Sequence, residues 1–219
     1  MIRFAESGGR QYDRTERKSM VPVCPDSEAV NRFQQGDADA FDELGRKYSA
    51  KLYNLGIRMC GSHEDAKDLM QETLISAFRS LDRFRKESKF SVWLFQIAKR
   101  RCINIHRKNK VSPDQLIPLE TLIPTEDERQ TLEIADWRTT PIQNLLNQEL
   151  GKHLEKAIAL LPPEYRMVLL LRDGEGFTAD ETAQILDLHV PAIKSRLHRA
   201  RLSIRKQLHQ YYQDGEHIS

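Results

Sequence analysis

The side chains best suited to chemistry lie between Val190 and Leu208, in a segment rich in cations and hydrogen-bonding groups. No acidic residue occurs between Asp187 and Asp214. The cations of this stretch include Lys194, Arg196, Arg199, Arg201, Arg205 and Lys206. A helix drawn through it turns one group of side chains away from its apolar stripe: Ala192, Ser195, His198 and Arg199. Small and hydrogen-bonding side chains can reach base edges in a DNA groove, and arginines can hold phosphates. The segment therefore indicates DNA binding.

Two helices are expected to position these side chains. Thr178 and Glu181 form a capping-box pattern that predicts a short helix from Thr178, and Pro191 suits the first position of a second helix. A single apolar stripe runs along the second helix: Ile193, Leu197, Ala200, Ile204 and Leu208. The short turn between the helices predicts a helix-turn-helix. The alternative is a solvated amphipathic helix whose charges serve only solubility.

A second candidate surface is acidic. The helix predicted from His63, capped by Ser62, has Ala66, Met70, Leu74, Ala77 and Leu81 on its apolar face. Asp65, Asp68, Gln71 and Glu72 share another face, beside Ile75. Acids in the first turn complement the helix dipole, which explains Asp65 and Asp68 without any partner. Glu72 lies too far along the helix for that explanation, so the surface suits a basic protein partner.

A third candidate surface combines an aromatic side chain with cations and amides. Residues 84–91 are expected to form a loop, with Ser91 capping a helix that buries Leu94, Ala98, Cys102 and Ile105. A different side of this helix carries Trp93, Gln96, Arg100, Asn104 and Arg107. Such a set can stack on an unpaired base and hold its backbone. Alternatively, Trp93 and Phe90 are core residues, as aromatic side chains in small helical domains commonly are.

Cysteine and histidine spacing offers weaker candidates. Cys60 with His63, and Cys102 with His106, could form two halves of a zinc site, or the cysteines could sense redox state. The simpler interpretation makes Cys102 a small buried hydrophobe. Neither a phosphate-binding glycine loop nor a nucleophile motif occurs in the sequence, so we expect no enzyme activity and no cofactor.

Composition bounds the organisation of the chain. The 219 residues carry a formal net charge of +2, which conceals a basic segment from Lys89 to Lys110 and an acidic, proline-containing one from Asp114 to Asp136. The latter predicts an extended tether. An odd number of cysteines, three in all, fits a reducing compartment, and no apolar run is long enough to span a bilayer. We therefore expect a cytoplasmic protein without membrane insertion.

Four motifs, in order, resemble bacterial sigma factors of the sigma-70 family, extracytoplasmic-function type. The motifs are DAKDLMQETLI from Asp65, FSVWLFQIA from Phe90, LPPEYRMVLLLRDGEGFT from Leu161 and IKSRLHRAR from Ile193. The resemblance implies an all-α fold of two small helical domains. It assigns sigma region 2 to residues 26–110 and sigma region 4, with the helix-turn-helix, to 146–212. Tails at 1–25 and 213–219 and a flexible acidic linker at 111–145 complete the organisation.

Site roles follow from the same resemblance. Asp65, Asp68, Gln71 and Glu72 match the surface that binds the clamp of core RNA polymerase. Positions matching −10 recognition and melting are Ser88, Lys89, Phe90, Trp93, Arg100, Asn104 and Arg107. Positions matching −35 recognition are Ala192, Lys194, Ser195, Arg196, His198, Arg199 and Arg201. The chain departs from the family at Pro191 and Ala192, where Gly-Thr is frequent, and at Arg100, where Asn is usual.

The implied partners are core RNA polymerase, at its clamp and flap, double-stranded promoter DNA, the unpaired non-template strand and an anti-sigma factor. The implied function is promoter-specific initiation of transcription for a stress or envelope response regulon. The linker would thread through polymerase channels or act only as a spacer. The competing hypothesis is a stand-alone regulator that binds DNA through its helix-turn-helix without polymerase.

Overall fold

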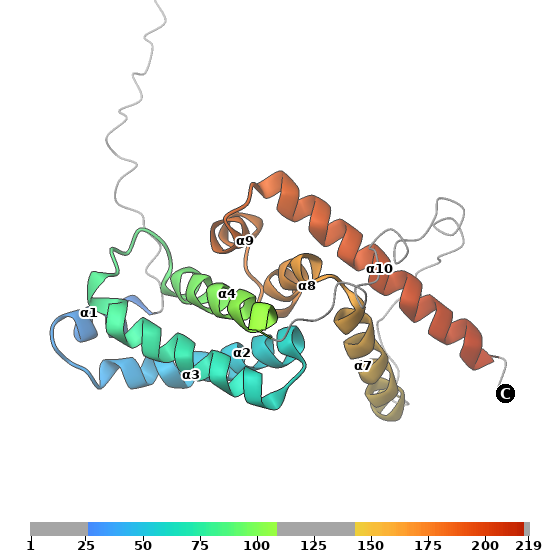
Figure 1. The fold of residues 1–219 in the computed structure, drawn as a ribbon, viewed down its shortest axis with the longest axis horizontal. Coiled ribbons are helices and arrows are strands. Elements are labelled where there is room, and N and C mark those ends of the chain that lie inside the picture. Colours follow the sequence, from blue (N-terminus) through green and yellow to red (C-terminus); the bar gives the residue numbers. More distant parts are fainter. Residues whose placement is uncertain (1–25, 109–142, 217–219) are drawn as a thin grey trace, which may run out of the picture.

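The computed structural model describes residues 26–108 and 143–216, and within those ranges it contains helices and no strand, which confirms the all-α prediction. The helices form two units that lie side by side (Figure 1). The N-terminal unit comprises α1 (Ser27–Gln34), α2 (Ala40–Cys60), α3 (His63–Ser80), η2 (Leu81–Arg83) and α4 (Phe90–Lys108). The C-terminal unit comprises α7 (Gln143–Leu160), α8 (Pro163–Leu169), η4 (Leu170–Gly174), α9 (Ala179–Leu186) and α10 (Val190–Glu216).

The N-terminal unit is built on the tight pairing of α2 with α3. A Cβ on Gly56 would lie 2.8 Å from the Cα atom of Ala66, so only glycine permits the two backbones to approach this closely. Gly61 ends α2 in the left-handed conformation, at φ 74°, and Ser62 caps α3 by accepting a hydrogen bond from the Asp65 amide. The turn folds α3 back along α2, and the cap at Ser62 is the one that the sequence predicts.

In the C-terminal unit, the helix-turn-helix has the predicted local chemistry. The Thr178 hydroxyl accepts a hydrogen bond from the Glu181 amide at 3.1 Å, and the Glu181 carboxylate accepts one from the Thr178 amide at 2.8 Å. Both halves of the capping box are therefore present. Asp187 ends α9 in the left-handed conformation, at φ 57°, which turns the chain into α10.

Several predicted details differ in the structure. Helix α4 begins at Phe90, and the Lys89 carbonyl accepts its first bond from the Trp93 amide, so Ser91 lies inside the helix and is no cap. The inner face of α3 includes Leu69 and Thr73, while Met70 and Leu74 are only partly buried. Helix α10 continues to Glu216, past the expected boundary at residue 212.

The expected linker at 111–145 lies outside the described residues except for its last three positions, which belong to α7. The expected tail at 1–25 lies outside them entirely. Among the helices that are described, none combines the length and the apolar character needed to cross a membrane.

Candidate DNA and polymerase interfaces

Helix α10 divides cleanly into a buried stripe and an outward surface. Ile193 and Ala200 are fully buried, Leu197 and Leu208 are nearly so, and Ile204 is partly buried, as the spacing predicts. Of the predicted −35 residues, the exposed ones are Lys194, Ser195, His198, Arg199 and Arg201. Ala192 and Arg196 are half-buried. The stripe thus fixes the rotation of α10, and this rotation turns hydrogen-bonding side chains to solvent.

Arg201 differs from the other cations of α10 because it has a partner inside its own unit. Its guanidinium donates to both carboxylate oxygens of Asp173, at 2.9 and 2.6 Å. The hydrogen bond that Arg201 donates to Asp173 raises the pKa of Arg201 above its ordinary value. A bidentate pair of this kind orients the side chain, so Arg201 ties α10 to η4 in this conformation.

The acidic surface of α3 is assembled as predicted from the helical spacing. Asp68, Gln71 and Glu72 are exposed, and Asp65 is half-buried near the capped start of the helix. Glu72 forms an ion pair of 2.8 Å with Arg101 of α4, whose side chain also donates to the Ser76 hydroxyl. Ile75 lies on the same surface and is 49% exposed. Carboxylates around an exposed apolar side chain make a surface suited to a basic protein partner.

The aromatic residues of α4 have two different fates. Phe90 is only 2% exposed, and its ring packs against Tyr48, Phe84 and Trp93. It is a core residue, so its side chain supports its neighbours and has no surface to offer DNA. Trp93 is half-buried, with its ring centroid 4.9 Å from that of Phe84. Trp93 therefore keeps part of its surface available above an aromatic platform.

The remaining predicted −10 residues are spread along α4 and the loop before it. Ser88 is half-buried, whereas Lys89, Arg100 and Asn104 are exposed. The side chain of Arg107 lies outside the described residues. The structure therefore brings Ser88, Lys89 and Trp93 together at the start of α4, while Arg100 and Asn104 follow two and three turns later.

The C-terminal unit contacts this same side of α4, in what we call the domain interface. Lys89 forms an ion pair of 2.7 Å with Glu181, the Gln96 amide donates to the Gln184 carbonyl at 3.0 Å, and Lys99 donates to the Leu186 carbonyl at 2.6 Å. Burial lowers the pKa of Lys99 from its ordinary value. The rings of Phe95 and Phe177 meet edge to face at 4.9 Å. The predicted promoter-opening surface is thus partly occupied by the helix-turn-helix of its own chain.

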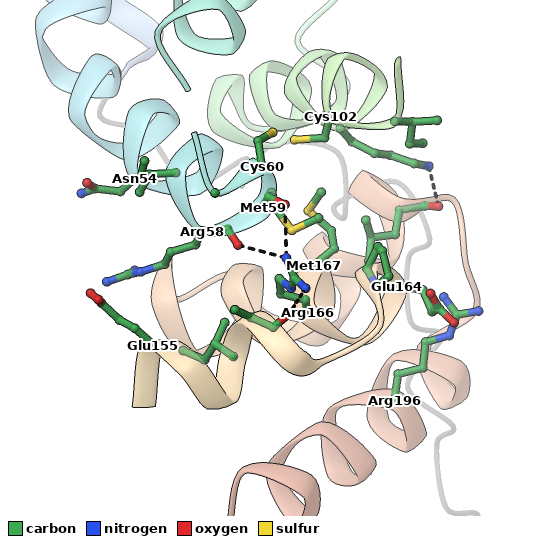
Figure 2. Close-up of a pocket in the computed structure, with 18 of the residues that line it drawn as sticks. Asn54, Arg58, Met59, Cys60, Cys102, Glu155, Glu164, Arg166, Met167 and Arg196 are labelled. Carbon is green, nitrogen blue, oxygen red and sulfur yellow. Dashed lines mark hydrogen bonds between the residues drawn. The ribbon is translucent and has the colours of Figure 1, made fainter. Parts of the chain in front are cut away.

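Arg166 is the interface residue that sequence analysis missed. Its guanidinium donates across the interface to the Met59 carbonyl at 3.2 Å (Figure 2). Within its own unit it donates to the Leu161 carbonyl at 2.9 Å. Burial lowers its pKa. It thereby binds carbonyl groups at the C-terminal ends of two helices, where the helix dipole favours a cation. A lone arginine in an apolar segment has no spacing signal that would have predicted this.

An apolar cavity of about 800 Å³ lies between the units beside Arg166. Cys60, Cys102, Ile103, Ile158, Met167 and Leu188 contribute to its lining. The thiols of Cys60 and Cys102 point toward each other (Figure 2), whereas the Nδ1 atom of His63 lies 2.6 Å from the Tyr53 hydroxyl oxygen. The side chain of His106 lies outside the described residues. Across the described side chains, no three histidine, cysteine or acidic groups gather in a way that could hold a metal ion.

Family models match both units of the chain. Sigma-70 region 2 matches residues 44–111, and sigma-70 region 4 matches residues 152–204. The chain is 34% identical to the ECF RNA polymerase sigma factor SigW of Bacillus subtilis, over 82% of this chain and 94% of the relative. It is 32% identical to the RNA polymerase sigma-H factor of Pseudomonas aeruginosa, over 86% of this chain and 96% of that protein.

Solved structures share the fold. CnrH, solved in complex with the cytosolic domain of CnrY, superposes with a TM-score of 0.61 at 21% identity, covering 84% of this chain and 97% of CnrH. The sigma factor RpoE of Bartonella quintana, solved with the anti-sigma factor NepR, gives a TM-score of 0.56 at 22% identity, over 78% of this chain and 97% of that one. These structures show the fold. The family models and the sequence relatives, which align over most of their own length and of this chain, show that the protein belongs to the extracytoplasmic-function group of sigma-70 RNA polymerase sigma factors.

Proposed function

We propose that this chain directs core RNA polymerase to promoters by reading a −35 element with α10 and opening a −10 element with α4. Members of the family are non-catalytic factors for promoter-specific initiation of transcription. To this we add the assignment of the −35 element to α10 and of the −10 element to α4. The observation that carries the proposal is the outward surface of α10, where Ser195, His198 and Arg199 are exposed opposite the apolar stripe. Such side chains can donate to and accept from base edges in the major groove.

For the −10 element, the start of α4 offers the chemistry that an extruded base requires. Taking a base out of the stack costs about a few kcal/mol, which aromatic and hydrogen-bonding contacts must offset. We assign the stacking surface to Trp93 and polar contacts to Ser88 and Lys89. Phe90 acts beneath them, because its buried ring fixes the position of Trp93 from below.

For polymerase binding, we assign Asp65, Asp68, Gln71 and Glu72 of α3 to the clamp. The exposed carboxylates support this assignment, since they provide electrostatic complementarity to a basic partner. Asp68 and Glu72 lie one helical turn apart, so both can contact one partner surface.

The packed arrangement of the two units corresponds, in this proposal, to a state that does not initiate. Elements centred near −35 and −10 are separated by roughly 85 Å of duplex, at about 3.4 Å per base pair. Helix α9 packs directly on α4 in this structure, and Lys89 is paired with Glu181. Reading both elements at once therefore requires the domain interface to open.

A protein partner that controls this opening is the remaining part of the proposal. CnrH and the Bartonella RpoE were each solved with a bound partner, the latter described as an anti-sigma factor. We propose that this chain is likewise held inactive, in the cytoplasm, by an anti-sigma factor until an inducing signal releases it.

Transcription in vitro tests the proposal. Purified chain and bacterial core polymerase would be combined on a library of promoter-like templates, and the RNA sequenced. We expect defined start sites that require the chain, with two enriched upstream elements. A matched reaction would contain the Asp68→Lys, Glu72→Lys double variant, which should give none of these starts. If the chain binds DNA tightly without polymerase and no start site depends on it, a stand-alone regulator is the better account.

A further inference from the structure

We propose that Cys60 and Cys102 form a dithiol site that a hydroperoxide converts reversibly into an intramolecular disulfide. Cys60 is the last residue of α2, and Cys102 lies in the middle of the buried face of α4. Both are free thiols, and they face each other above the cavity (Figure 2). They are 42 positions apart in sequence, so only the packing of α2 on α4 brings them together.

The two thiols are electrostatically unequal. The hydrogen bond from Cys102 lowers the pKa of the Cys60 thiol, and it outweighs partial burial and the negative charge of Asp65, which raise that pKa; the positive charge of Arg166 adds a smaller lowering. The same hydrogen bond, together with burial, raises the pKa of Cys102 well above its ordinary value. Cys60 is therefore the more readily ionised thiol and the nucleophile of the pair, and Cys102 is the hydrogen-bond donor to it.

Access favours the same order of reaction. Cys60 is half-buried and lines the cavity of about 800 Å³, whereas Cys102 is only 1% exposed. A small hydroperoxide entering the cavity meets the more reactive sulfur first. Because a thiolate attacks and a thiol does not, the accessible and activated Cys60 is the site of oxidation.

The chemistry balances in two steps. The Cys60 thiolate attacks the terminal oxygen of the hydroperoxide and the O–O bond breaks, which converts Cys60 into a sulfenic acid. The leaving oxygen takes up a proton and departs as an alcohol or, from hydrogen peroxide, as water. Cys102 then attacks the sulfenic sulfur, the S–S bond forms and water leaves. Two of the three causes that raise the pKa of Cys102 come from Cys60, and both disappear once Cys60 is no longer a thiolate. Oxidation of Cys60 therefore activates the thiol that resolves it.

Mass spectrometry of the full-length chain tests the site. A Cys24→Ser variant, checked for helicity by circular dichroism, would be treated with one equivalent of hydrogen peroxide. We expect the monomer to lose two hydrogen masses, a peptide linking Cys60 to Cys102 to appear, and dithiothreitol to reverse both changes. If the variant does not fold, peptide mapping of the unsubstituted chain after the same treatment shows whether Cys60 and Cys102 are linked.

The matched control adds Cys102→Ala, which keeps Cys60 but removes its resolving partner. In that protein Cys60 should gain oxygen and form no internal disulfide. Its alkylation by iodoacetamide should also require a higher pH than in the chain that retains Cys102. The proposal is overturned if Cys60 forms dimers between chains, if it gains two oxygens while Cys102 stays free, or if neither thiol reacts.

Discussion

Helices α3 and α4 pack against each other, yet the surfaces they offer to partners are in different states. The acidic surface of α3 is exposed, and the ion pair that Glu72 forms with Arg101 is contained within the N-terminal unit. The first half of α4 and the residue before it are instead engaged by the C-terminal unit, through Lys89, Gln96 and Lys99. The difference suggests an order of events for the proposed roles: the chain can present the surface that we assign to polymerase while the surface that we assign to promoter opening is still covered.

Reversing the charge of the α3 surface should have the largest effect. We expect Asp68→Lys combined with Glu72→Lys to weaken binding to core polymerase by about 100-fold or more, because like charges across an interface cost several kcal/mol. Fluorescence anisotropy of labelled chain titrated with core polymerase measures this. Asp39→Lys with Asp42→Lys makes the same charge change at exposed positions at the start of α2 and should bind normally. Equal loss in both variants would remove the special role of α3.

A substitution in α10 should have the next largest effect and should leave polymerase binding unchanged. Arg199→Ala is expected to weaken binding to the preferred −35 sequence by about 1 to 3 kcal/mol if its guanidinium reads a base. Arg205→Ala is the matched control, an exposed arginine farther along the same helix. Promoter binding by the assembled polymerase would be measured on matched and mismatched −35 sequences. This comparison distinguishes an arginine that reads a base from one that contacts only phosphates. A uniform loss over all sequences would show that Arg199 contacts only phosphates.

Removing one ion pair from the domain interface should have a smaller effect on how closely the two units pack. Lys89→Glu places a carboxylate against Glu181, but Lys89 is half-exposed, and pairs of this kind contribute only about 0 to 1 kcal/mol. We expect a modest increase in the radius of gyration by small-angle X-ray scattering. Lys86→Glu, the same charge change at another exposed lysine in the preceding loop, should leave the radius unchanged. An unchanged radius in Lys89→Glu would mean that the other contacts hold the units closed without this pair.

The smallest expected effect is the contribution of the Glu181 carboxyl to stability at low pH. Partial burial raises the pKa of the Glu181 carboxyl, but hydrogen bonds from Lys89 and the Thr178 amide outweigh it, so the pKa lies below its ordinary value. Its stabilisation is therefore present above the unfolded pKa, near 4.3, and is lost as the pH falls through the lower folded value. An NMR titration of the carboxyl carbon would check this. Lys89→Ala should move the pKa upward while leaving the capping box intact, and an unmoved pKa would contradict the contribution of Lys89.

Local patterns predicted most of the helices because each rests on chemistry within a few residues. The capping box at Thr178 and the left-handed Gly61 needed no tertiary information. The stripe of α10 was equally readable, since a helix that covers a core must repeat its apolar residues with the helical period. The start of α4 was misplaced by the same local reasoning, because Ser91 resembles a cap but packing sets the helix to begin at Phe90.

The sequence by itself therefore determined the helices, the exposed side chains of α10 and the acidic surface of α3. Tertiary structure alone decided that Phe90 is a core residue, that Arg166 holds the end of α2, and that Cys60 meets Cys102. The physical reason is the distance along the chain over which each interaction acts. Periodicity and capping act over a few residues along one helix, whereas these three outcomes depend on which helices pack together and on the burial and charge that packing creates.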